Sequence, residues 1–191
     1  ANRIYAQSGI HDAFVERLTT ATAALTVGPG SEPGTEIGPL IDDKALAKIR
    51  EHIVDATGKG AHLRCGGTAH PRGGRFFAPT VLTGVTADML VSKEETFGPL
   101  APVFRFDHED EVIAQANATP FGLAAYFYAR DIGRIWRVAE AIEAGIVGVN
   151  TGLISTELAP FGGIKASGLG REGSKYGIDD YLEIKYLCLG L

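Results

Sequence analysis

Apolar residues at helical spacing define the first part of the chain. Between residues 10 and 25 they recur every three or four positions, which predicts an amphipathic helix that Gly-Pro-Gly at 28–30 ends. A Gly- and Pro-rich loop leads to a second predicted helix, which begins at Asp42 or Asp43 with an aspartate as its N-cap and runs to about residue 57. The residues expected on its buried side are Leu46, Ile49, Ile53 and Val54.

Alternating or continuous apolar runs predict the strands. We expect them at 1–7, 61–65, 79–85, 101–106, 123–129 and 145–150. Predicted helices at 109–118 and 132–142 separate the last three strands, and this alternation favours an α/β fold with an open, mainly parallel sheet and helices on both faces. The last strand delivers Asn150 and its following loop to the edge where such sheets bind ligands.

The C-terminal residues alternate as a strand that has no partner of its own. We expect this strand to pair with a neighbouring subunit or with another segment, because an unpaired edge needs a second edge. This prediction divides the chain into a main domain, 1–178, and an oligomerisation arm, 179–191.

Composition excludes several classes of protein. The 191 residues are 45% hydrophobic and carry a net charge of -5. That charge, spread without a basic cluster, argues against nucleic-acid binding. No apolar run is long enough to span a membrane and the start does not resemble a signal peptide, so we expect a cytoplasmic protein. Because the only methionine is Met89, Ala1 is not an initiator residue, and we expect something longer to precede it.

Cysteine and histidine give no sign of a metal site. Cys65 and Cys188 are too few for a disulfide scaffold, lie in no metal-binding spacing and are expected to pack as small apolar residues. The five histidines are scattered along the chain, and none is predicted to be a ligand or a catalytic base.

The stretch from 150 to 177 is rich in glycine, which favours a tight, buried loop system at the rim of a site. It contains the pattern GxGxxG at Gly168, Gly170 and Gly173. A dinucleotide-binding fingerprint would follow a strand and open a helix within a βαβ unit. The residues before this match look like loop, so we interpret it as accidental.

Three blocks identify a resemblance that extends over the whole chain. ANRIYAQ at the start, KEETFGPL at 93–100 and PFGGIKASGLGREGSKYG at 160–177 resemble the C-terminal part of an aldehyde dehydrogenase. NTGLIS before the last block and DDYLEIKYLCLGL after it are most similar to the bacterial succinate-semialdehyde dehydrogenases of that family.

The resemblance implies a reaction whose central groups this chain lacks. In the family a cysteine thiolate attacks the aldehyde, hydride passes to NAD or NADP, and a glutamate-activated water hydrolyses the thioester. The resemblance places the nucleophile just before Ala1 and the general base and glycine-rich cofactor loop further upstream. We therefore assign no catalytic residue here, expect the chain alone to be inactive, and find no determinant of NAD against NADP preference.

A cofactor half-site is implied in the second block. Glu95 matches the family glutamate that accepts hydrogen bonds from the nicotinamide ribose, and Phe97 would back the nicotinamide. Without the resemblance, residue type favours a solvated surface carboxylate for Glu95 and a core aromatic for Phe97.

Substrate residues are implied in the loop after Asn150. Phe161 matches the aromatic at the aldehyde funnel, and Ser155 occupies a position where semialdehyde-specific members bind the distal carboxylate. By residue type alone Ser155 also fits an ordinary loop serine. Lys165, Arg171 and Glu172 match the family motif but are expected to be structural, pairing to hold the loop.

Two classes of function follow. The first is an oxidoreductase: the C-terminal part of a homo-oligomeric succinate-semialdehyde dehydrogenase, or of a dehydrogenase for another semialdehyde such as glutarate semialdehyde. The second is a catalytically inactive assembly fragment that oligomerises through its terminal strand.

Overall fold

The computed structural model describes residues 1–190, which form two compact units, Ala1–His108 and Glu109–Leu191. The sequence did not suggest a division after His108, because the strands on either side of it read as parts of one alternating pattern. The arm boundary near residue 179 stays a prediction.

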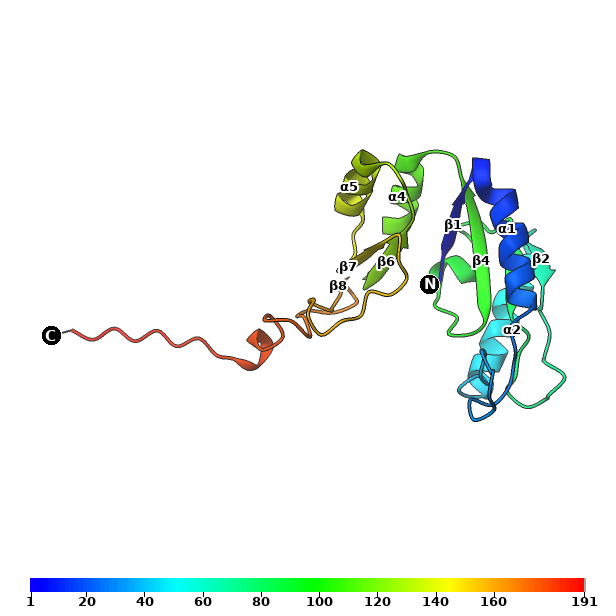
Figure 1. The fold of residues 1–191 in the computed structure, drawn as a ribbon, viewed down its shortest axis with the longest axis horizontal. Coiled ribbons are helices and arrows are strands. Elements are labelled where there is room, and N and C mark those ends of the chain that lie inside the picture. The colour runs from blue at the N-terminus through cyan, green and yellow to red at the C-terminus, as the bar shows by residue number, and fades with distance from the viewer. Residues whose placement is uncertain (191) are drawn as a thin grey trace. The chain divides into compact units, whose positions relative to one another are not determined.

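The first unit is an α/β layer structure around a four-stranded sheet. Its elements are β1 (Ile4–Gln7), α1 (Ser8–Ala23), α2 (Asp43–Gly58), β2 (His62–Cys65), β3 (Thr80–Thr83), α3 (Leu90–Lys93) and β4 (Leu100–Phe106). The strand order is β1-β4-β3-β2, in which β4 runs parallel to both of its neighbours and β2 runs antiparallel to β3 (Figure 1). The predicted mainly parallel sheet is confirmed for this unit.

Helices cover both faces of this sheet, as predicted. Successive side chains of a strand point to opposite faces. Val103 of β4 therefore packs with Val15 of α1, whereas Phe104 packs with Ile49 of α2 on the other face. Burial of an aromatic such as Phe104 stabilises the fold by roughly 1.5–3 kcal/mol.

Helix α2 begins where the sequence predicts, but one of the residues predicted on its buried side, Val54, is exposed. The Asp42 side chain accepts a hydrogen bond of 2.7 Å from the backbone N–H of Ala45, so Asp42, one of the two expected aspartates, is the N-cap. Val54 is 69% exposed. The buried residues follow one helical stripe: Ile49, His52, Ile53 and Ala56. Each residue turns the helix by about 100°, so Val54 points well away from that stripe.

The second unit contains shorter elements. They are α4 (Glu109–Asn117), β5 (Phe121–Gly122), β6 (Ala124–Phe127), α5 (Ile132–Ala141), β7 (Ile146–Val149), β8 (Ile164–Lys165) and the 3-10 turn η1 (Asp179–Tyr181). Strands β6 and β7 pair in parallel, and β5 pairs antiparallel with β8. The predicted helices at 109–118 and 132–142 and the strands at 123–129 and 145–150 are present, but the strands form two small sheets rather than extending a single one, and the predicted C-terminal strand is not formed in the described part of this chain.

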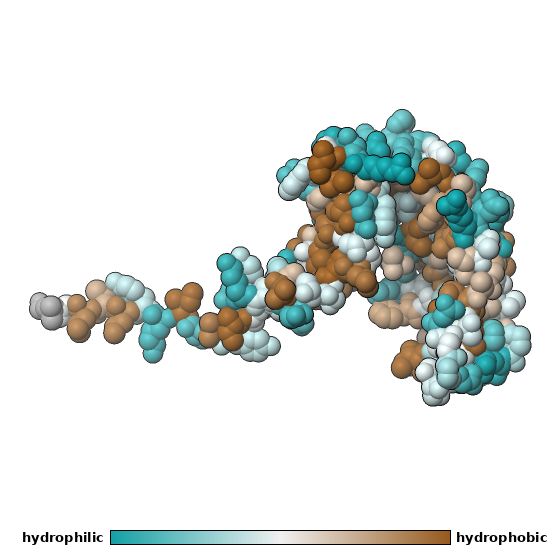
Figure 2. Space-filling model, viewed as in Figure 1, coloured by the Kyte–Doolittle hydropathy of each residue, from teal (hydrophilic) through white to brown (hydrophobic). Residues whose placement is uncertain are grey.

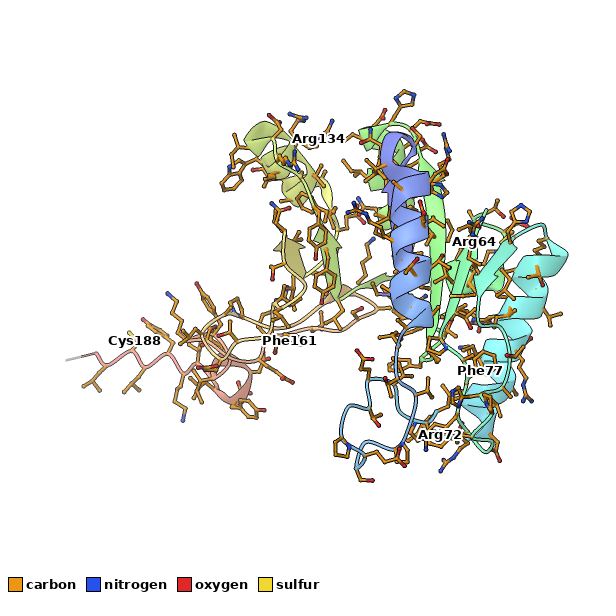
Figure 3. The ribbon with its side chains drawn as sticks, turned by 45° about the vertical axis from the view of Figure 1, so that its right-hand side comes forward. Arg64, Arg72, Phe77, Arg134, Phe161 and Cys188 are labelled. Atoms are coloured by element: carbon orange, nitrogen blue, oxygen red, sulfur yellow. The ribbon has the colours of Figure 1, made fainter. Side chains whose placement is uncertain are left out.

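The C-terminal segment, residues 182–190, contains no helix or strand and is exposed throughout; Leu191 lies outside the described residues. Hydrophobic residues are spaced along it (Figure 2). Cys188 lies on this segment with its side chain exposed, so its predicted packing as an apolar residue is wrong (Figure 3). Pairing of the segment with another subunit stays a prediction. Within residues 1–190, no helix is long and apolar enough to cross a membrane.

Replacing Asp42 with alanine should destabilise the first unit by about 1 kcal/mol, because the cap bond to Ala45 is lost. Chemical denaturation measures the effect. The matched control is Asp43→Ala, which removes the same charge in the first turn but no cap bond and should cost less. Equal losses in the two variants would contradict the assigned cap.

Candidate functional site

The first candidate half-site is the turn that enters β4, residues 94–99. The Thr96 side chain is buried, and its hydroxyl forms a 2.9 Å hydrogen bond with Nδ1 of His52 on α2. The Asn2 amide bonds both neighbours of Glu95: its Nδ2 donates to the carbonyl of Glu94 at 3.0 Å, and its Oδ1 accepts from the N–H of Thr96 at 3.2 Å. The turn is therefore fixed on both sides of Glu95.

Glu95 itself is exposed on this fixed backbone. Among residues 1–190, no hydrogen bond or ion pair engages its carboxylate, whereas the neighbouring Glu94 pairs with Lys48 at 3.2 Å. The hydrogen bond from Lys48 lowers the pKa of Glu94. An exposed, uncommitted carboxylate on a rigid turn suits a group that accepts hydrogen bonds from ligand hydroxyls.

Phe97 is not a core residue of this unit. Its side chain is 78% exposed, and its backbone has φ of 46°, a left-handed conformation that is uncommon outside glycine. Gly98 then passes close to the core: a Cβ there would lie 3.1 Å from Ile49 and 3.3 Å from Leu40. The side chain of Phe97 borders an open depression of about 410 Å³ that residues 36–41 also line.

The second candidate half-site begins at the carboxyl end of β7. Asn150 has φ of 57° and turns the chain out of the strand. Its side chain extends the sheet, because Oδ1 accepts from the N–H of Ala129 at 2.9 Å and Nδ2 donates to the carbonyl of the same residue at 2.8 Å. Asn150 thus starts the loop from a fixed point, where the sequence placed it.

Ser155 and Phe161 lie further along this loop. Ser155 is exposed, and no hydrogen bond of its hydroxyl is found within the described chain. Phe161, labelled in Figure 3, is half-buried. Its backbone exchanges hydrogen bonds of 2.8 and 2.7 Å with Glu172. A further bond of 2.8 Å joins the N–H of Ser174 to the carbonyl of Glu157. These bonds hold the loop that contains Ser155 against the rest of the glycine-rich stretch 150–177, which we call the glycine block.

The glycine block packs backbone against backbone, which confirms that it is not a linker. A Cβ on Gly162 would lie 2.6 Å from the carbonyl oxygen of Gly170, so no side chain fits there. Most of its side chains are nevertheless exposed in this chain, and the predicted burial is wrong. The positions of the GxGxxG match have positive φ and lead to the turn η1 rather than to a helix, so this match is not a dinucleotide fingerprint.

The charged residues of the block hold structure, but not by pairing with one another. Lys165 forms an ion pair with Glu143 and donates to the carbonyl of Asn117 at 2.9 Å. Arg171 donates to the carbonyls of Gly163 and Gly170, at 2.9 and 2.7 Å. Both cations therefore donate hydrogen bonds to backbone carbonyls, and among residues 1–190 neither pairs with Glu172 as expected.

Both cysteines are free, and they lie in different surroundings. Cys65 is half-buried at the end of β2, and its Sγ lies 3.8 Å from the carbonyl oxygen of Pro79. Cys188 is on the exposed C-terminal segment. Among the residues that the structure describes, no three His, Cys, Asp or Glu side chains gather as a metal site.

Sequence reasoning missed Asn2 and His52. Asn2 lies more than ninety residues from the turn that it binds, and no local pattern reveals such a contact. His52 had a signal: it falls on the same helical stripe as Ile49 and Ile53 and is only 1% exposed. A polar residue on a buried stripe indicates a polar partner across the packing interface.

Residues 1–187 match the aldehyde dehydrogenase family, and the chain belongs to that family. All of the chain aligns at 67% identity with 40% of the NADP(+)-dependent succinate-semialdehyde dehydrogenase GabD of Escherichia coli K12. It also aligns in full, at 66% identity, with 39% of a glutarate-semialdehyde dehydrogenase of Pseudomonas aeruginosa.

The structural comparison agrees with the sequences. A crystal structure described as an E. coli NADP-dependent enzyme superimposes with a TM-score of 0.98 at 67% identity, and the match covers all of this chain and 40% of that one. The chain thus spans about 40% of the length of these relatives.

Acidification should destabilise the first unit through His52. Burial, and then the charge of Lys48, lower the pKa of His52 below its ordinary 6.5, although Glu94 opposes the shift. The unfolded chain therefore binds a proton more readily, so the stabilising contribution is complete above pH 6.5 and falls as the pH drops below it. The slope from one group is at most about 1.4 kcal/mol per pH unit.

Denaturant unfolding at pH 7.5, 6.5, 5.5 and 5.0 measures this slope. His52→Asn keeps a polar atom near Nδ1 but does not titrate, so part of the slope above pH 5 should disappear. Glu94 and the aspartates with lowered pKa values titrate below this range. The control is His62→Asn on an exposed position; an unchanged slope in His52→Asn would refute the assignment.

Proposed function

We propose that this chain is part of a cytoplasmic, NAD(P)-dependent semialdehyde dehydrogenase that oxidises succinate semialdehyde to succinate. The observation that carries the proposal is the 67% identity to a succinate-semialdehyde dehydrogenase over all 191 residues. The two candidate half-sites are compatible with it, because each presents an exposed, uncommitted polar side chain on a fixed loop.

Glutarate semialdehyde is the second candidate substrate. The chain is 66% identical to a dehydrogenase named for that aldehyde, which is almost the same identity as to the succinate-semialdehyde dehydrogenase. The two aldehydes differ by one methylene and share a distal carboxylate. One methylene in a pocket changes discrimination by only about 1–3 kcal/mol. The substrate class that we propose is therefore a short aldehyde with a carboxylate at its far end.

In the proposed enzyme, each of the two half-sites contributes binding groups rather than the reacting ones. Glu95 would accept hydrogen bonds from the nicotinamide ribose, and Phe97 would form a wall beside the ring. When bound, the nicotinamide accepts the hydride of the aldehyde carbon. Ser155 would donate a hydrogen bond to the distal carboxylate, and Phe161 would line the approach of the aldehyde.

We propose that the nucleophilic cysteine and the glutamate base lie outside residues 1–191, so that these residues alone are inactive. Two observations support this part of the proposal. Cys65 is half-buried with its Sγ against the carbonyl of Pro79, Cys188 lies on the exposed C-terminal segment, and the relatives are about two and a half times as long.

The test of this proposal is the protein purified from its own gene, with its intact mass and its activity measured on one sample. A mass well above 20.2 kDa together with NADH or NADPH production from succinate semialdehyde supports the proposal. If residues 1–191 alone turned over the aldehyde, the proposal that the nucleophile lies outside them would be wrong. A full-length protein without turnover on either semialdehyde would favour an assembly role.

Replacing Ser155 with alanine should raise the KM for succinate semialdehyde by about tenfold, because a hydrogen bond to a charged group is lost. The KM for butanal, which has the same chain length without the carboxylate, should change little. Steady-state kinetics with both aldehydes distinguishes specific from general damage. Ser31→Ala, an exposed serine of another loop, serves as the control, and equal losses on both aldehydes would contradict the role of Ser155.

We further propose that the protein is a homo-oligomer that pairs through its C-terminal segment. Exposed apolar side chains such as Ile184, Tyr186 and Leu189 support this, because a monomer would leave them in water. Deleting residues 182–191 should lower the mass measured by light scattering to that of a smaller assembly. Cys188→Ser should keep the full assembly, and an unchanged mass after the deletion would exclude the segment as the interface.

A further inference from the structure

Asn2 links the first residues of the chain to the turn that carries Glu95. A single planar amide makes both bonds: it donates to the carbonyl before Glu95 and accepts from the N–H after it. The two peptide groups that flank Glu95 therefore cannot rotate independently of Asn2. The Asn2 amide thus forms the same pair of hydrogen bonds with the turn that the backbone N–H and C=O of a neighbouring strand would form.

The rest of the turn is held by contacts that do not include Glu95. The Thr96 hydroxyl is fixed by His52, and the Glu94 carboxylate by Lys48. The Glu95 carboxylate remains uncommitted among residues 1–190. The chain thus orders the backbone of Glu95 while leaving its side chain available, which is the arrangement of a preorganised binding group.

We propose that Asn2 is a positioning residue for Glu95 and thereby sets the affinity for the nicotinamide cofactor; this inference rests on the proposed function. Asn2 need not touch the cofactor. It holds the peptide groups on both sides of Glu95, so that the carboxylate meets the ribose hydroxyls without first paying the entropy of ordering the turn.

The test compares cofactor affinity in Asn2→Ala, Glu95→Gln and the double variant of the full protein, by fluorescence titration with NADPH and with NADH. Each single variant should weaken binding by about tenfold, the effect of losing one well-placed hydrogen bond. The double variant should be no weaker than Glu95→Gln, because Asn2 acts through Glu95. The KM for the aldehyde should stay within about twofold of the unmodified protein in Asn2→Ala.

Asn2→Asp is the second variant, in case the alanine protein does not fold. It keeps the acceptor for the N–H of Thr96 and loses the donor to the carbonyl of Glu94, so a smaller, few-fold loss of cofactor affinity is expected. Gln7→Ala is the matched control, because Gln7 also donates an amide hydrogen bond to a backbone carbonyl, that of Asp107 at 3.3 Å. This control should leave cofactor affinity unchanged.

The outcomes separate the inference from the proposed function. If Glu95→Gln weakens cofactor binding and both Asn2 variants do not, the positioning role is wrong and the proposed function stands. If Glu95→Gln has no effect, the proposed cofactor role of Glu95 fails, and the inference fails with it. If Asn2→Ala raises the KM for aldehyde and cofactor equally, or the losses add in the double variant, Asn2 is only a structural residue.

Discussion

Burial of β4 on both faces is the constraint on which the first unit depends. The strand has hydrogen-bonded neighbours on both edges, and α1 and α2 cover its two faces. A slip of one residue would exchange Val103 and Phe104 between faces that fit different partners, so its register is fixed. The turn that carries Glu95 leads directly into this strand, and Gly98 brings that turn into contact with α2. The position of the turn is thus a consequence of core packing.

A small polar network, formed by His52, Thr96 and Asn2, holds the turn in addition to the apolar contacts of the core. His52 lies among buried apolar residues, where an unpaired imidazole is costly, and its bond to Thr96 satisfies one of its two ring nitrogens. The other nitrogen, Nε2, lacks a hydrogen bond and lies 3.6 Å from Glu94. The network joins α2, the turn and the first residues of the chain. It also makes this part of the fold sensitive to protonation of His52 in a range where Glu94, whose pKa is lowered, remains charged.

The glycine-rich loop of the second unit, residues 150–177, is held by backbone contacts rather than by a buried core. Its side chains are mostly exposed, and its order comes from close backbone contacts, from backbone bonds between segments, and from Arg171 and Lys165 donating to carbonyls. Such a loop can present Ser155 without burying it. Glycine is required where one backbone crosses another at Gly162, so the composition of the block reflects packing rather than phosphate binding.

The sequence by itself determined the longer helices and strands, the α/β class, an aspartate cap at 42 or 43 and the family, because these depend on local periodicity, local hydrogen bonds and contiguous motifs. It also located the strand end at Asn150. Tertiary structure alone decided that Asn2 binds a turn more than ninety residues away and that Lys165 pairs with Glu143. These contacts join residues far apart in the chain, and their partners are chosen by the packing of whole elements, which no local pattern encodes.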